Sequence, residues 1–134
     1  MINTKVSMIP NEVTESLSIQ LGKRKLIKAN LQVFEFIDNG FIVIYNPSLE
    51  LSAYGKNSED ALHMFKEVVF KDFCENLTSL PEGKVYEELK RLGWNRNVIF
   101  QKKLSRTTRV DREAVSKEFN LTEKSEIKEL LLTV

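Results

Sequence analysis

The sequence predicts a mixed α/β (α+β) fold in which a three- to four-stranded, mainly antiparallel meander packs against one long helix, with a helical extension at the C-terminus. The first observation is a pair of stretches rich in branched and aromatic residues on either side of Asp38-Asn39-Gly40, which is typical of a β-hairpin. The second is a helix start signal at Asn57, directly after another alternating stretch. With 134 residues the chain can enclose one ordinary hydrophobic core.

Four predicted strands follow an N-terminal arm. Residues 1–16 are polar and irregular in pattern, so we expect them to form this arm. Apolar and polar residues alternate over residues 17–21, which indicates a half-buried strand. Residues 26–37 and 41–45 form the two sides of the hairpin, and the second side is apolar on both faces, which favours a central strand. Residues 49–54 alternate again and complete the meander.

The long helix is predicted over residues 58–77. Asn57 is placed to cap its free amides, and Asp60 three residues later favours the positive end of the helix dipole. An apolar stripe on this helix can cover one face of the meander, and it comprises Ala61, Leu62, Phe65, Val68, Val69 and Phe73. A shorter helix is expected between the start signal at Ser79 and the stop signal at Gly93.

The C-terminal third is predicted to contain one strand and two helical segments. Residues 98–100 are branched or aromatic and indicate the strand, and a polar and basic tract follows at 101–112. Residues 111–119 and 123–132 have helical patterns on either side of a three-residue turn, which allows a helix-turn-helix. We therefore divide the chain into an arm (1–16), an α/β domain (17–104) and a helical extension (105–134).

Composition limits the function. The formal net charge of +1 argues against a surface tuned as a whole for nucleic acid or an anionic membrane. The charge is uneven, because residues 41–83 hold seven acids and three bases while residues 84–112 hold nine bases and three acids. Cys74 is the only cysteine, so no intramolecular disulfide can form and a reducing, cytoplasmic location is expected. No run of about 18 apolar residues occurs, so neither export nor membrane insertion is expected.

Few residues of the kind that carry catalysis are present, so we expect no enzymatic activity, no metal and no cofactor. His63 is the only histidine and falls on the predicted polar side of the helix. Cys74 lies eleven positions further on, about 16 Å away by the rise of an α-helix, which excludes a thiol and imidazole pair. Glu35 would have a perturbed pKa only if its face of the hairpin is buried. A hydrolase that gathers carboxylates from distant segments is a third possibility.

Basic residues concentrate in one tract that comprises Arg96, Lys102, Lys103, Arg106, Arg109 and Arg112. Together with Trp94 and Phe100, this tract could neutralise phosphates while a ring packs or stacks on a base. The alternative is a solvated strand and loop, with both rings in the core. With the helix-turn-helix, the tract supports a second functional hypothesis, a nucleic-acid-binding transcriptional regulator.

The stretch from Tyr45 to Ala61 carries a family resemblance. It reads Tyr-Asn-Pro-Ser-Leu-Glu-Leu-Ser-Ala-Tyr-Gly-Lys-Asn-Ser-Glu-Asp-Ala, and over residues 26–77 the chain resembles the HicB-like antitoxin family. Family positions are matched in the turn and at the helix entry by Pro47, Leu49, Gly55, Asn57, Glu59, Asp60 and Ala61. Ser48 stands where the family has aspartate, the Pro-Gly-Cys portion of the turn is absent, and the spacing from Pro47 to Gly55 is one residue shorter.

The resemblance implies a partly degenerate ribonuclease H-like domain that acts by binding. Typical members sequester a small toxin nuclease with a double-stranded-RNA-binding fold, and many repress their own operon as dimers through a C-terminal DNA-binding motif. For this chain we therefore expect a homodimer that binds a small toxin-like protein, with duplex DNA as the alternative partner and no membrane. The residues expected at the partner surface are Tyr45, Pro47, Glu50 and Tyr54. The acidic section around Glu50, Glu59, Asp60 and Glu67 would suit a basic partner.

Overall fold

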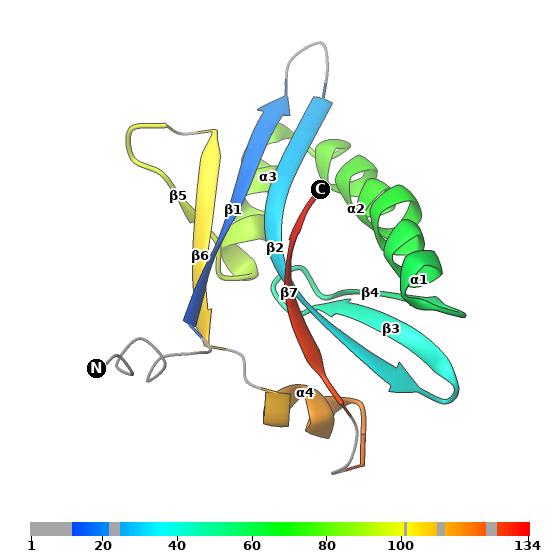
Figure 1. The fold of residues 1–134 in the computed structure, drawn as a ribbon. Helices are drawn as coiled ribbons and strands as arrows, with labels where there is room; N and C mark the ends of the chain where they lie inside the picture. The colour runs from blue at the N-terminus through cyan, green and yellow to red at the C-terminus, as the bar shows by residue number, and fades with distance from the viewer. Residues whose placement is uncertain (1–11, 22–24, 101, 110–111, 123–125) are drawn as a thin grey trace.

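The computed structural model describes residues 12–21, 25–100, 102–109, 112–122 and 126–134, and it has the mixed α/β fold expected from the sequence (Figure 1). In these residues the sheet is larger than the predicted meander, because seven antiparallel strands take part in it. The elements are β1 (Glu12–Leu21), β2 (Lys25–Asp38), β3 (Phe41–Asn46), β4 (Leu51–Gly55), α1 (Ser58–Met64), the π-helical turn η2 (Phe65–Val69), α2 (Phe70–Thr78), α3 (Glu82–Arg91), β5 (Asn95–Arg96), β6 (Lys103–Arg109), α4 (Arg112–Glu118) and β7 (Lys128–Thr133).

The long strand β2 joins two lobes of the sheet. Residues 25–30 of β2 pair with β1, and residues 34–38 pair with β3. Strand β7 pairs with residues 30–35 of β2 without interruption. This stretch of β2 overlaps with the residues that pair with β1 and with those that pair with β3. Because a strand residue has one neighbour at each edge, β7 must lie along one edge of β2 while β1 and β3 share the other. One lobe is therefore β1, β6 and β5, and the other lobe is β3 and β4 (Figure 1).

A buried carboxylate closes the junction between the lobes. Glu15 is only 1% exposed, and its Oε2 atom accepts hydrogen bonds from Gln32 N at 2.9 Å, Asn46 Nδ2 at 3.1 Å and Ser48 Oγ at 2.8 Å. Asn46 Nδ2 also donates to Gln32 O at 2.7 Å. Arg106 Nη1 lies 4.0 Å from Glu15 Oε1. These side chains supply the hydrogen bonds that neither β1 nor β3 offers to the backbone of Gln32.

Helices cover both faces of the sheet. The continuous helical segment from α1 through η2 to α2 spans residues 58–78, which confirms the predicted long helix, and it packs with α3 on one face. The core on that face includes Leu17, Ile19, Leu31, Val33, Ile44, Phe65, Leu89 and Trp94. The shorter α4 covers part of the opposite face, where the buried cluster is Phe34, Phe36, Val43, Val115 and Ile127. The rest of that opposite face is open in the described part of the chain.

Two predictions for the C-terminal third are wrong. The second helix expected at residues 123–132 is instead strand β7 over residues 128–133, so in the described residues α4 has no partner helix of the kind that a helix-turn-helix needs. The strand expected at residues 98–100 is the exposed loop between β5 and β6. Much of the basic tract forms β6, which pairs with β1 and runs across the boundary drawn at residue 104.

The start signal assigned to Ser79 is also wrong. Ser79 ends α2, and its Oγ donates to Asn76 O at 2.7 Å. The next helix begins at Glu82, directly after Pro81, whose carbonyl accepts the first backbone hydrogen bonds of α3. The interpretation of Ser79 failed because a serine hydroxyl serves as well in the last turn of a helix, where it donates to a carbonyl.

Candidate functional site

The residues considered for catalysis do not form a reactive centre. Among the described residues there is no group of three or more His, Cys, Asp or Glu side chains that could bind a metal ion. His63 is exposed at the end of α1, whereas Cys74 is half-buried in α2, where burial raises the pKa of its thiol to about 12. Such a thiol is almost entirely protonated at neutral pH and is a poor nucleophile. Glu35 accepts a hydrogen bond from Ser58 Oγ at 2.9 Å at the start of α1.

Two of the four residues expected at a partner surface, Tyr45 and Tyr54, share one face of the β3–β4 lobe. Tyr45 lies opposite Ser52, and Tyr54 lies opposite Val43, so both tyrosines project from the same face. Tyr54 is 53% exposed, but Tyr45 is half-buried because the ring of Phe119 lies against it, with the two ring centroids 4.9 Å apart. Burial, with Glu118 and Glu50 nearby, raises the pKa of the Tyr45 phenol well above its usual value. Tyr45 is thus a packing residue with an acidic surrounding.

The other two residues, Pro47 and Glu50, form the turn between β3 and β4. Pro47 O accepts a hydrogen bond from Glu50 N at 3.2 Å, and Glu50 is exposed with a φ of 58°. Sequence reasoning missed Phe41, which is half-exposed on the same face as Tyr45 and Tyr54. The signal was available, because Phe41 precedes Val43 and Tyr45 at the period of two that governs a strand.

Strand β4 is the last strand of its lobe, and no other strand pairs with its outer edge in the described residues. Glu50 precedes the strand, and the exposed acids Glu59 and Asp60 follow it in the first turn of α1. The predicted cap is confirmed, since Asn57 Oδ1 accepts a hydrogen bond from Asp60 N at 2.8 Å. Gly55 is required where β4 meets α1, because a Cβ atom there would lie 2.7 Å from Ala61 Cα. The tight entry holds acidic residues at both ends of an open strand edge.

The basic residues of the predicted nucleic-acid tract whose side chains the structure describes do not form one surface. The Arg96 guanidinium lies 3.7 Å from the ring centroid of Tyr86, and Arg112 forms an ion pair with Glu129 at 3.1 Å. Arg106 points toward the junction of the lobes, where its Nε donates to Leu92 O at 3.0 Å. Arg109 ends β6, and its side chain is outside the described part. Lys102 and Lys103 are both exposed; Lys102 directly precedes β6 and Lys103 is its first residue.

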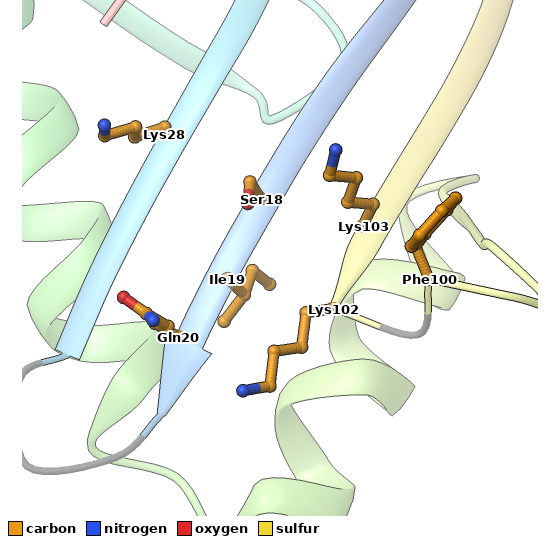
Figure 2. Close-up of a pocket in the computed structure, with 7 residues that line it drawn as sticks. All are labelled: Ser18, Ile19, Gln20, Lys28, Phe100, Lys102 and Lys103. Atoms are coloured by element: carbon orange, nitrogen blue, oxygen red, sulfur yellow. The ribbon is translucent and has the colours of Figure 1, made fainter.

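Lys102 and Lys103 line a pocket of about 480 Å³ on the open face of the sheet (Figure 2). The remaining lining residues are Ser18, Ile19, Gln20, Lys28 and Phe100. Figure 2 shows the three lysine ammonium groups pointing in different directions, one from β2 and two from the beginning of β6. The exposed ring of Phe100 lies 5.5 Å from Lys103 Nζ. Sequence reasoning missed Lys28, although its alternation with the apolar residues of β2 places it on the polar face.

Two further observations concern known proteins and the helices. No protein-family model, curated protein or solved structure matches this chain. None of the helices in the described segments is long and apolar enough to cross a membrane. The HicB-like resemblance therefore rests on residues 26–77 themselves and stays a prediction.

Proposed function

We propose that the chain is a non-catalytic protein-binding module of the antitoxin type, which sequesters a small basic protein at strand β4. The observation that carries the proposal is the outer edge of β4, which is unpaired in the described residues and has acids at both ends. A strand added at this edge would gain backbone hydrogen bonds, and Tyr54 would contact its side chains. The flanking carboxylates would speed association with a basic partner and disfavour acidic ones.

The composition of this surface supports a protein partner. Phe41 and Tyr54 are both at least half exposed and project from one face of the lobe, at the end of β4 that leads into the acidic first turn of α1. Exposed aromatic residues are typical of the centre of protein interfaces. The acids would repel a phosphate backbone, so nucleic acid is disfavoured at this end of the molecule.

The test begins with the reading frames next to this gene, one of which we expect to encode a small basic protein that can be produced as the binding partner. Binding would be measured by titration calorimetry at two salt concentrations. Tyr54→Ala is expected to weaken binding at least tenfold, since a central tyrosine contributes roughly 2 kcal/mol. Combined reversal at Glu50, Glu59 and Asp60 to lysine is expected to slow association and remove the salt dependence.

The matched control is Glu113→Lys, an equally simple charge reversal on the exposed surface of α4. It is expected to leave the affinity unchanged. Equal loss in the control and in the β4 variants, or wild-type binding without salt dependence, would contradict docking at this edge.

A second candidate function is binding of single-stranded nucleic acid on the open sheet face. The pocket lysines favour it, because Lys28, Lys102 and Lys103 form no ion pair within the part of the chain that the structure describes. Their ammonium groups diverge, which suits an extended chain of phosphates better than one isolated phosphate (Figure 2). The exposed ring of Phe100 offers a surface on which a base could stack.

Salt dependence gives this candidate a numerical test. Three phosphate contacts on a single strand correspond to a slope of about −2 in a plot of log K against log salt concentration. Fluorescence anisotropy with a labelled oligonucleotide would measure it, and each Lys→Ala change in the pocket is expected to reduce the slope by about 0.7. The control is Lys84→Ala, which removes a lysine from α3. An unchanged slope in the pocket variants would exclude this site.

A further inference from the structure

A further open edge of the sheet runs along β7. Strand β7 pairs with β2 on one side, and no strand among the described residues pairs with its other side. Its centre is both apolar and exposed, since it consists of Leu130, which is 42% exposed, and Leu131, which is 62% exposed. An apolar edge strand without proline or a central charge is a template for pairing with another strand. We propose that β7 pairs antiparallel with β7 of a second copy of this chain, so that the sheet continues across a two-fold axis.

Hydrogen bonds to β2 decide which residues of β7 face outward. Ala29 and Val134 exchange both backbone hydrogen bonds, at 3.1 Å and 2.9 Å. In an antiparallel pair such exchanges occur at every second residue, so Leu132 and Leu130 also direct their backbone groups toward β2. Leu131 therefore directs its N–H and C=O away from β2. The same conclusion follows independently from its partner Gln32, whose N and O atoms bond to the opposite edge.

The outward residues of β7 select one register for self-pairing. Glu129, Leu131 and Thr133 are the three that face away from β2 by this alternation. All three can bond to the second copy only when Leu131 lies opposite itself and Glu129 lies opposite Thr133. This register forms six backbone hydrogen bonds across the two-fold axis and brings no like charges into opposition. It also places the two Leu131 side chains next to each other on the open face.

A second copy fits this edge better than a basic or acidic partner does. Lys128 and Glu129 give β7 no net charge, in contrast to the acid-flanked β4. Each exposed leucine would bury roughly 100 Å² of apolar surface. Even with the paired backbone, the contact is small compared with the 1,600 Å² or so of a stable interface. The dimer is therefore reversible, and it forms and dissociates with concentration.

The first experiment is sedimentation of the full chain over a range of concentrations. The wild type is expected to shift from monomer to dimer, and Leu131→Lys is expected to weaken dimerisation at least tenfold because it opposes two like charges at the centre. The matched control is Val98→Lys in the β5–β6 loop, where the side chain is 88% exposed and far in the fold from β7. Unchanged melting temperatures would show that both variants are folded. A wild type that stays monomeric, or a Leu131→Lys variant that still dimerises, would overturn the proposal.

The second experiment tests the register in a Cys74→Ala background. Leu131→Cys is expected to form an intermolecular disulfide, because hydrogen-bonded antiparallel residues have Cα atoms about 5.5 Å apart, which suits the bond. Leu130→Cys lies opposite Leu132 of the second copy and is expected to remain largely uncrosslinked. Equal crosslinking at both positions would refute the register. The same measurement on a variant lacking residues 1–11 tests whether the chain covers its own edge. If this variant dimerised and the full chain did not, residues of the same chain would occupy the edge of β7, and the proposal would be refuted.

Discussion

Replacement of Glu15 by alanine is expected to lower the free energy of unfolding by about 3 kcal/mol. The carboxylate accepts hydrogen bonds from three donors at the junction of the lobes. Two of these donors keep a second acceptor, since Asn46 Nδ2 also bonds to Gln32 O and Ser48 Oγ also lies within reach of Asn46 Oδ1. Only Gln32 N would be left buried without a partner, at a cost of roughly 1–3 kcal/mol. The lost charge-assisted bonds and the ion pair with Arg106 account for the remainder.

Urea denaturation followed by tryptophan fluorescence would measure this loss. Trp94 is the only tryptophan, and its Nε1 donates to Ser48 O at 3.3 Å, so it reports on the same junction. Glu15→Gln keeps one acceptor oxygen and is expected to cost less than alanine does. The control Glu113→Ala removes an exposed glutamate and is expected to stay within about 0.5 kcal/mol of the wild type. If Glu15→Ala matched that control at an unchanged denaturant slope, the hydrogen-bonding role of Glu15 would be refuted.

Three further outcomes are expected. Asn57→Ala should cost about 1 kcal/mol in a thermal melt, because Asp60 N loses its side-chain acceptor. Gly55→Ala should lower the urea midpoint by the equivalent of about 2 kcal/mol, since the new methyl group meets the backbone of Ala61, and an unchanged midpoint would contradict the close approach. The Cys74 thiol has a pKa raised by burial to about 12 from a usual 9.0, so native protein should resist alkylation at pH 8.5 and react once unfolded in urea. Because the folded state holds this proton more tightly, the contribution of the thiol to stability should be constant below pH 9 and decline between pH 9 and 12, and the absence of a decline there would contradict the shift.

Elements that depend on neighbouring residues were predictable from the sequence, and elements that depend on distant pairing were not. The β2–β3 hairpin follows from Asn39 and Gly40, which adopt φ values of 53° and 83° in its turn. By contrast, β7 pairs with a strand about 100 residues earlier in the chain. Its leucine run is compatible with a helix or a strand, and the edge of β2 decides between them. Similarly, β6 has little apolar character and owes its strand conformation to β1.

Composition alone does not locate the loop and the pocket near the basic tract. The apolar run at residues 98–100 satisfies the composition of a strand, yet it forms a loop tip because Asn97 Oδ1 accepts the amides of Ile99 and Phe100 at 2.9 Å and 2.8 Å. One asparagine thus ends the pairing that composition favours. Lys28 lines the basic pocket because β2, β1 and β6 are consecutive strands of the sheet. This strand order cannot be predicted from the sequence of the basic tract alone.

The burial of Glu15 follows from the topology of the sheet. Sequence reasoning placed this residue in the N-terminal arm, although it continues the alternation of Leu17 and Ile19 toward the core. Because β1 and β3 share one edge of β2 and separate there, the backbone of Gln32 must find both an acceptor and a donor from side chains. Glu15 supplies the acceptor and Asn46 supplies the donor. A chain that keeps this two-lobed sheet but loses Glu15 or Asn46 should therefore need to replace the remaining one as well. Either residue without the other leaves a buried polar group unpaired.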